Sequence, residues 1–144
     1  MSGPIDETFT AQQLKAGSVF EFGCSPAHFT ARMAKRSDLK ITAMDLYPAE
    51  TTEGFTFIQG DFMNYQTEEK FDNVCSVSAW EHCGIERLNY MEEYREDTNY
   101  HLLVAEKLKS FVKPGGRLII TCPFGCDELY LTDGKGSNWR IGDP

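Results

Sequence analysis

The sequence has no excess of positive charge, and this absence limits the partners that it suits. Fourteen Lys and Arg residues stand against twenty-two Asp and Glu residues, which gives a net charge of −8 over 144 residues. A protein that binds a nucleic-acid backbone needs a basic face for phosphate contacts. We therefore expect no nucleic-acid partner, and we note that the negative charge is compatible with a cationic small ligand.

Long apolar runs are also missing. No segment approaches the ~20 apolar residues that a membrane-spanning helix needs, and the first residues lack the basic-then-apolar order of a secretory signal. We expect no membrane partner. With 41% hydrophobic residues, the chain suits one globular domain covering residues 1–144 with a single core.

The cysteines form no C-x-x-C pair, and their number is odd. They stand at five scattered positions: Cys24, Cys75, Cys83, Cys122 and Cys126. Three scattered histidines supply no complement at zinc spacing, so we predict no metal site. Unpaired cysteines within apolar segments favour a reduced, cytoplasmic setting.

One stretch organises the rest of the chain, and it lies at residues 19–29. A short apolar run predicts a buried strand, and Gly23 predicts a sharp turn after it. Ser25 is then expected to cap a helix whose first residue is Pro26. A strand, a tight turn and a helix N-terminus in this order let backbone N–H groups approach a ligand closely.

Two further strands are predicted to end on acidic residues. Residues 39–45 end at Asp45, and residues 54–60 are followed directly by Asp61. A carboxylate at the end of the neighbouring strand can accept hydrogen bonds from both hydroxyls of a ribose, each worth roughly 1.5–3 kcal/mol. The alternative for both residues is ordinary turn chemistry on the surface.

A fourth strand is predicted over residues 71–78. The loop after it carries two adjacent polar residues, Glu81 and His82. In a doubly wound sheet this loop lies beside the ligand crevice. His82 has a pKa range suited to a general base near neutral pH. A structural histidine held by hydrogen bonds is the alternative.

An amphipathic helix is predicted from the caps at residues 97–99 to residue 112. The Pro and Gly residues at 113–116 end it, and residues 117–122 form a fifth strand. We interpret residues 85–99 as a loop or loose helix on the substrate side.

Two of these stretches resemble the class I S-adenosylmethionine-dependent methyltransferases. The spacing Glu21-x-Gly23-x-Ser25-x-Ala27 resembles their acidic-x-Gly-x-Gly-x-Gly motif, although Ser and Ala replace the second and third glycines. The run at residues 108–120, with its Lys-Pro-Gly-Gly turn, is similar to the signature before their fifth strand. The motifs follow the family's order across about residues 17–125.

The resemblance implies an α/β fold. We expect a three-layer sandwich around a mainly parallel, Rossmann-like sheet of strand order 3-2-1-4-5. Family members continue with a further helix and two strands, which are missing here, so we expect a fragment; a naturally shortened member or a domain that another chain completes are the alternatives. Residues 1–16 would then cover the domain or form a lid, and residues 123–144 would form an irregular tail.

The resemblance also implies the activity, which is transfer of a methyl group from S-adenosyl-L-methionine to O or N of a small-molecule acceptor. His82 and Glu81 are the candidate catalytic residues. Glu21 and the turn after it would face the methionine part of the cofactor, Asp45 the ribose and Asp61 the adenine. The full set of expected cofactor-binding residues is Glu21, Gly23, Cys24, Ser25, Ala27, Asp45, Leu46, Asp61, Phe62 and Ser76.

Two other functions compete with this interpretation. The chain could be a truncated cofactor-binding or assembly module without catalysis of its own. An NAD(P)-binding oxidoreductase fits less well, because His28 would occupy the position of the last glycine in the G-x-G-x-x-G pattern.

The fifth strand is apolar on both faces, and an uncovered apolar edge recruits other strands. We therefore also expect self-association through this edge.

Overall fold

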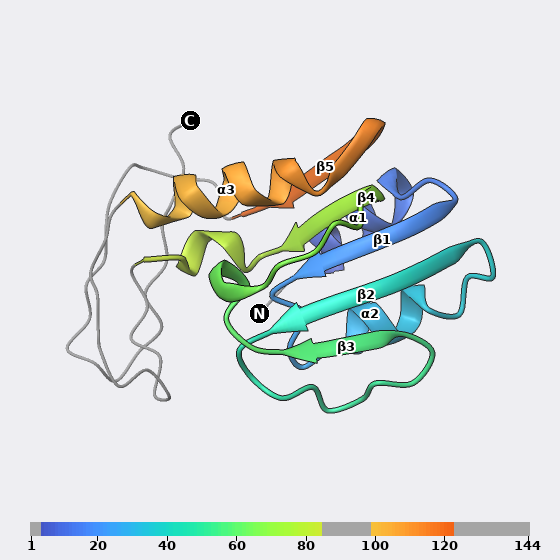
Figure 1. Cartoon of the computed structure of the whole chain (residues 1–144). Coiled ribbons are helices and arrows are strands. Elements are labelled where there is room, and N and C mark those ends of the chain that lie inside the picture. Colours follow the sequence, from blue (N-terminus) through green and yellow to red (C-terminus); the bar gives the residue numbers. More distant parts are fainter. Residues whose placement is uncertain (1–3, 85–98, 123–144) are drawn as a thin grey trace.

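Five parallel strands form the centre of the molecule (Figure 1). The computed structural model describes residues 4–84 and 99–122. The strands are β1 Gly17–Phe22, β2 Leu39–Asp45, β3 Thr56–Gln59, β4 Phe71–Val77 and β5 Val112–Thr121. They pair in the order β3-β2-β1-β4-β5, and every pair is parallel. The predicted α/β fold and strand order are confirmed.

Helices cover both faces of this sheet (Figure 1). The helices α1 Pro4–Gln13 and α2 His28–Met33 lie on one face, and α3 Tyr100–Ser110 lies on the other. Two short 3-10 helices, η1 Phe62–Asn64 and η2 Trp80–His82, follow β3 and β4. None of the described helices has the length and the apolar character to cross a membrane.

Two hydrophobic clusters, one on each face of the sheet, explain why the sequences of the central strands are continuous apolar runs. Side chains of consecutive strand residues point to opposite faces, and both faces are buried here, as parallel sheets require. Beneath α1 and α2 lie Leu14, Val19, Cys24, Ala27, Ile41, Ala43, Cys75 and Ile119. Beneath α3 lie Phe20, Met44, Phe62, Phe71, Val74, Val104, Leu108 and Phe111. The three-layer arrangement is thereby confirmed.

The start of α2 differs from the prediction. The helix begins at His28, and Ala27 before it has a left-handed backbone with φ 74°. Ser25 does not cap it: its N–H donates to Asp45 Oδ2 at 2.8 Å and its hydroxyl donates to the carbonyl of Pro48 at 3.0 Å. The predicted cap was wrong because the helix starts at His28 rather than Pro26, and the Ser25 hydroxyl binds the Pro48 carbonyl instead.

The last strand begins earlier than predicted. β5 already pairs with β4 at Val112, opposite Phe71, and a register shift follows. The segment predicted as a turn, residues 113–116, is thereby part of β5. The buried side of α3 carries Val104 and Leu108, whereas the apolar side chain of Leu102 in the same helix is 53% exposed.

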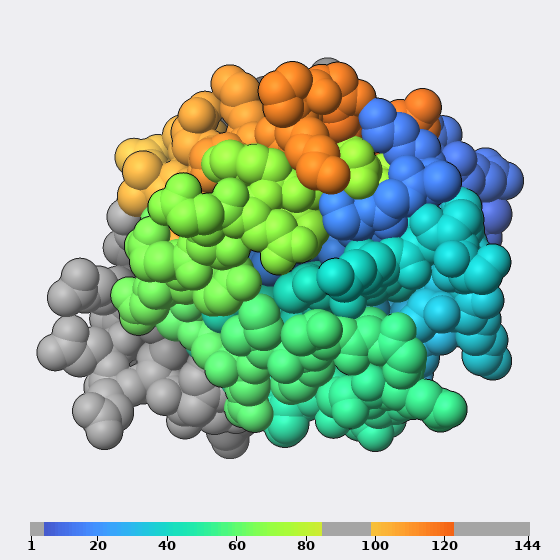
Figure 2. Space-filling view, turned by 45° about the vertical axis from the view of Figure 1, so that its right-hand side comes forward, coloured from blue at the N-terminus to red at the C-terminus, as the bar shows by residue number. Residues whose placement is uncertain are grey.

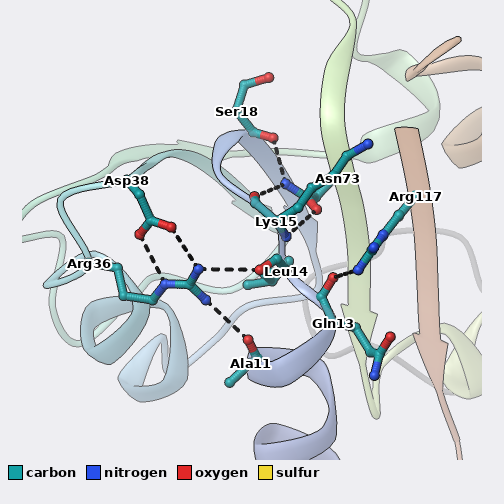
Figure 3. Close-up of polar contacts among 9 residues, drawn as sticks. All are labelled: Ala11, Gln13, Leu14, Lys15, Ser18, Arg36, Asp38, Asn73 and Arg117. Atoms are coloured by element: carbon teal, nitrogen blue, oxygen red, sulfur yellow. Dashed lines mark hydrogen bonds and ion pairs between the residues drawn. The ribbon is translucent and has the colours of Figure 1, made fainter. Parts of the chain in front are cut away.

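The C-terminal end of α1 is tied to the starts of the strands (Figure 3). Fully buried Asn73 donates to the carbonyls of Lys15 and Ser18 and accepts from the N–H of Lys15. Arg36 donates to the carbonyls of Ala11 and Leu14, at 3.1 and 3.2 Å. These bonds satisfy carbonyl groups that the end of a helix leaves open, and they fix α1 across the sheet.

β5 is the outermost strand of the described sheet, on the side opposite β3. Figure 2 shows the orange residues of α3 and β5 along the upper rim of the molecule. Beside this edge is a hollow of about 370 Å³ lined by Phe9, Gln13, Arg117, Leu118, Ile119 and Ile120. Self-association through the edge stays a prediction, which light scattering would test.

Candidate functional site

The strand order of this sheet reverses between β1 and β4. The chain leaves β1 for α2 on one face and leaves β4 toward α3 on the other. Such a reversal between neighbouring parallel strands opens a crevice at their carboxyl ends, where ligands bind in open α/β sheets. The predicted site residues around 21–27 and 76–82 therefore lie on its two sides.

The two sides come into contact at Gly23. Its backbone has φ 76°, and a Cβ added there would lie 2.3 Å from the Cβ of Ala79. The N–H of Gly23 donates to the carbonyl of Met44 at 2.8 Å, which ties the turn to β2 as well. Both the left-handed backbone and the close approach require glycine.

Glu21 is a buried carboxyl on the helix-α2 side, with 3% of its surface exposed. Its Oε2 accepts a hydrogen bond of 2.7 Å from the hydroxyl of Thr30. Burial raises the pKa of Glu21 to about 7, the Thr30 hydroxyl opposes this rise, and the nearby Asp45 carboxylate adds to it. The Glu21 carboxyl thus changes between its protonated and ionised forms near neutral pH.

Asp45 holds the turn after β1 against the end of β2. Its Oδ2 accepts from the N–H of Ser25 and its Oδ1 from the N–H of Tyr47, both at 2.8 Å. Both oxygens of this carboxylate therefore bind backbone N–H groups of the two turns. The turn role that the sequence offered as the alternative is present, and the ribose role stays a prediction.

Asp61 and Phe62 lie farther out, at the end of β3. Asp61 Oδ1 accepts from the N–H of Met63 at 2.9 Å and so caps η1. The ring of Phe62 is buried among the rings of Phe20, Phe22 and Phe111. The Phe62 side chain therefore belongs to the core.

The ammonium group of Lys107 fastens this loop to α3. It donates to the carbonyls of Phe62, Met63 and Tyr65 at 2.6, 2.9 and 2.6 Å. It also lies 5.0 Å from the centre of the Phe62 ring. The sequence analysis missed Lys107 because a lysine within a polar helix face carries no signal of such a contact.

On the β4 side the loop is built from hydrogen bonds to β4 itself and to α1. Ser76 Oγ accepts from the N–H of Trp80 at 3.1 Å. Ser78 has a left-handed backbone with φ 48°, and its hydroxyl donates to Asp6 Oδ2 at 2.8 Å. The contact between Asp6 and Ser78, also missed from the sequence, places the first turn of α1 over this loop.

Glu81 and His82 follow directly. Glu81 is 2% exposed, and burial raises the pKa of its carboxyl. Its Oε1 lies 3.9 Å from Nε2 of His82, whose side chain is 24% exposed. Within the described part of the chain, Glu81 Oε2 has no hydrogen-bond partner.

The structure thus gathers some predicted residues and separates others. Glu21, Gly23, Ser25 and Asp45 meet at the ends of β1 and β2. Cys24 lies among them with 7% exposure, and burial raises the pKa of its thiol. Leu46 continues from Asp45, and its carbonyl accepts from Gln59. The remaining predicted residues lie at β3 or β4: Asp61, Phe62, Ser76, Glu81 and His82.

Neither a metal cluster nor a disulfide occurs in residues 4–84 and 99–122. No three His, Cys, Asp or Glu side chains there lie close enough to hold a metal ion. None of the four cysteines in these residues forms a disulfide.

The profile of the FtsJ-like methyltransferase family matches residues 4–122. The chain belongs to the FtsJ-like methyltransferase family. The matched segment includes every described helix and strand. The methyltransferase resemblance carried by the turn at Gly23 and the run at residues 108–120 is confirmed.

Two curated relatives span the same region. The chain is 28% identical over 127 residues to ribosomal RNA large subunit methyltransferase E of Wolbachia sp. subsp. Brugia malayi, covering 81% of this chain and 54% of that protein. It is 22% identical to carboxy-S-adenosyl-L-methionine synthase of Psychrobacter arcticus, covering 88% of this chain and 47% of that protein. The chain thus spans about half the length of these relatives.

Solved structures share the fold. The 1,6-didemethyltoxoflavin-N1-methyltransferase of Burkholderia thailandensis superposes with a TM-score of 0.73 at 16% identity, over 96% of this chain and 60% of that one. A sugar N-methyltransferase of Streptoalloteichus gives a TM-score of 0.64 at 15% identity, over 85% and 49%. At these identities the likeness concerns the fold alone.

Proposed function

We propose that this chain binds S-adenosyl-L-methionine and transfers its methyl group to O or N of a small-molecule acceptor. The observation that carries the proposal is the turn at the switch point. There, Gly23 packs against Ala79 and the carboxylate of Asp45 holds the Ser25 N–H. Membership of a methyltransferase family supports the same conclusion.

The residues of the crevice fit this cofactor. Its chemistry is simple, because the methyl group is already activated on a sulfonium sulfur, and the protein mainly positions the reactants and excludes water. Asp45 lies at the end of β2 beside this turn and would accept hydrogen bonds from the ribose hydroxyls, and Glu21 lies beside the same turn, where a cationic methionine part would sit. Asp61 and the backbone of Phe62 would contact the adenine side.

A small acceptor is favoured over RNA by charge. The net charge of −8 opposes the phosphate backbone, and Glu81 adds a buried carboxyl on the acceptor side. RNA is the alternative, because one curated relative is named a ribosomal RNA methyltransferase. Tight, salt-dependent binding of an RNA oligonucleotide to the purified chain would exclude the small-acceptor proposal.

Calorimetry with S-adenosylmethionine, S-adenosylhomocysteine and NAD on the same sample tests the cofactor. We expect the first two to bind and NAD not to bind; binding of NAD alone would overturn the proposal. Asp45→Ala should weaken cofactor binding by roughly 2–4 kcal/mol through loss of two charge-assisted bonds. Asp45→Asn, which keeps an acceptor oxygen, is the matched control and should lose less.

The role of His82 as a base is tested separately once an acceptor is found. His82→Ala should lower turnover by ~10²–10⁴-fold and leave cofactor affinity unchanged. An unchanged rate would return His82 to the structural alternative that the sequence also allowed.

A further inference from the structure

A buried polar region lies where α1 crosses the loop after β4. In the described part of the chain, two buried side-chain atoms have no hydrogen-bond partner, Glu81 Oε2 and Thr10 Oγ1. Glu81 is 2% exposed and Thr10 is fully buried. Nearly all buried polar groups in native proteins have a hydrogen-bond partner. A ligand that supplies the missing partners is one explanation for two such atoms in one small domain.

The two atoms belong to elements that pack against each other. Thr10 stands one helical turn after Asp6, so both lie on the same side of α1. Asp6 in turn accepts the hydroxyl of Ser78 at 2.8 Å, three residues before Glu81. The same side of α1 therefore faces the loop that carries Glu81.

Burial is the main reason that the pKa of Glu81 is raised, and the Asp6 carboxylate adds a smaller rise. His82 and the amino terminus of the chain oppose this rise. The pKa of Cys122 is raised by burial first and then by Glu81 and Asp6. Burial thus outweighs the positive groups near Glu81, the closest of which is His82 of its own loop, 3.9 Å away.

This arrangement is held in place rather than free to relax. α1 is fixed at its other end by Arg36 and Asn73. Ser78 keeps a left-handed backbone, a conformation that costs a non-glycine residue of order 1–3 kcal/mol and that clusters at ligand sites. Leaving a carboxyl buried and without a donor is itself costly. A ligand that brings N–H donors and positive charge would relieve this cost.

We propose that Asp6 and Glu81 bind the amino group of the acceptor, so that the substrate is a primary or secondary amine that arrives protonated. This inference rests on the proposed function, and it selects nitrogen over oxygen as the methylated atom. Thr10 supplies a hydroxyl for a further polar group of the same molecule.

The atoms and charges of the reaction balance. Asp6 and Glu81 hold the ammonium group, which gives one proton to the imidazole of His82, the base of the proposed function, and this frees the nitrogen lone pair. That lone pair forms the new N–C bond to the methyl carbon while the C–S bond breaks. The electrons of the broken bond stay on sulfur, which changes from a sulfonium cation to a neutral thioether. The charge of the amine, now methylated, stays positive.

The test uses the full chain and a set of amine fragments with matched alcohols, for example phenethylamine and 2-phenylethanol. Ligand-observed NMR, with and without S-adenosylhomocysteine, measures their binding. We expect amines to bind at least about tenfold more tightly than the matched alcohols. Glu81→Gln should reduce amine binding by about ten- to a hundredfold, the worth of one charge-assisted hydrogen bond, and Asp6→Asn should also reduce it.

The exposed Glu53→Gln is the control and should change nothing. Glu81→Gln has the same shape and removes a buried charge, so its thermal midpoint should equal or exceed that of the wild type at pH 8. Alcohols that bind as well as amines would overturn this inference, as would unchanged amine binding in folded Glu81→Gln. Absence of S-adenosylhomocysteine binding would overturn the proposed function instead. In that case, the relative binding of amines and alcohols to the chain without S-adenosylhomocysteine would decide this inference alone.

Discussion

The two sides of the crevice differ in how their carboxyls are satisfied. On the side of β1 and β2, Glu21 accepts from Thr30, and Asp45 accepts from two backbone N–H groups. On the side of β4, Glu81 has one oxygen without a donor from the described chain. One side is completed by its own hydrogen bonds, whereas the other buries a polar group that a ligand could satisfy.

This difference matches the division of labour that we propose. A cofactor site that is complete before binding loses little freedom when the ligand arrives. In a site for a charged acceptor, contacts with that acceptor must instead offset the free-energy cost of burying the polar groups of the site. The contact between Gly23 and Ala79 is where the two sides meet, so substitutions there test whether they depend on each other.

Gly23→Ala should have the largest effect on the fold. The new methyl group would lie 2.3 Å from the Cβ of Ala79, on a backbone with φ 76°. The left-handed backbone costs about 1–2 kcal/mol and the overpacking about 1–3 kcal/mol, so we expect the free energy of unfolding to fall by about 2–5 kcal/mol. Urea denaturation measures it.

Gly115→Ala is the matched control for this substitution. Its φ is 77°, almost the same, but an added Cβ meets nothing within 4 Å. It should therefore lose only the backbone cost, about 1–2 kcal/mol. Equal losses of unfolding free energy at the two positions would mean that Gly23 and Ala79 are not tightly packed against each other.

The pH dependence of stability should come next in size. The pKa of Glu21 rises from 4.5 to about 7 on folding. Below pH 4.5 both states hold the proton and Glu21 has no effect; between pH 4.5 and 7 the unfolded chain ionises first, so stability falls. Above pH 7 the loss levels off at up to about 3 kcal/mol.

Comparison with Glu21→Gln isolates this effect, because other acidic groups titrate in both proteins. The difference in unfolding free energy between variant and wild type should change by up to about 3 kcal/mol between pH 4.5 and 7, in favour of the variant. A difference that stays constant with pH would show that Glu21 keeps an ordinary pKa despite its burial.

The sequence predicted the elements of the cofactor side well, because local patterns encode them. Apolar runs ending on Asp45 and Asp61 gave two strands and their acidic ends, and the order of motifs gave the sheet. The predicted helix cap at Ser25 failed for a tertiary reason, since the Ser25 hydroxyl binds the carbonyl of Pro48, which follows a different strand. Because the Asp45 carboxylate accepts from the Ser25 N–H, Asp45→Ala should also cost some stability.

The acceptor side was less predictable, because its contacts join residues far apart in the chain. Asp6 meets Ser78 across 72 positions, and no spacing or periodicity announces such a pair. The sequence offered Glu81 and His82 as polar candidates after a strand, yet it gave no sign that Glu81 would be buried without a donor. Residues 85–98 and 123–144, expected on the substrate side and in the tail, lie outside the described residues.

A second link between the sides runs through Lys107, and breaking it should have the smallest effect. Its ammonium group, carried by α3, donates to three carbonyls of the loop after Asp61. Lys107→Met keeps the length of the side chain and removes these donors. Because the group is only part-buried, water replaces much of what is lost, and we expect a loss of about 1 kcal/mol in unfolding free energy.

The loop that Lys107 holds carries the two residues expected at the adenine, so cofactor affinity measures the link more directly than stability does. Lys107→Met should weaken S-adenosylhomocysteine binding by less than about tenfold in calorimetry, which corresponds to 1.4 kcal/mol. Lys109→Met, two residues on and exposed, is the control and should leave both quantities unchanged. If Lys107→Met lowered stability without any change in affinity, the loop after β3 would belong to the core alone, and the cofactor side of the crevice would end at β2.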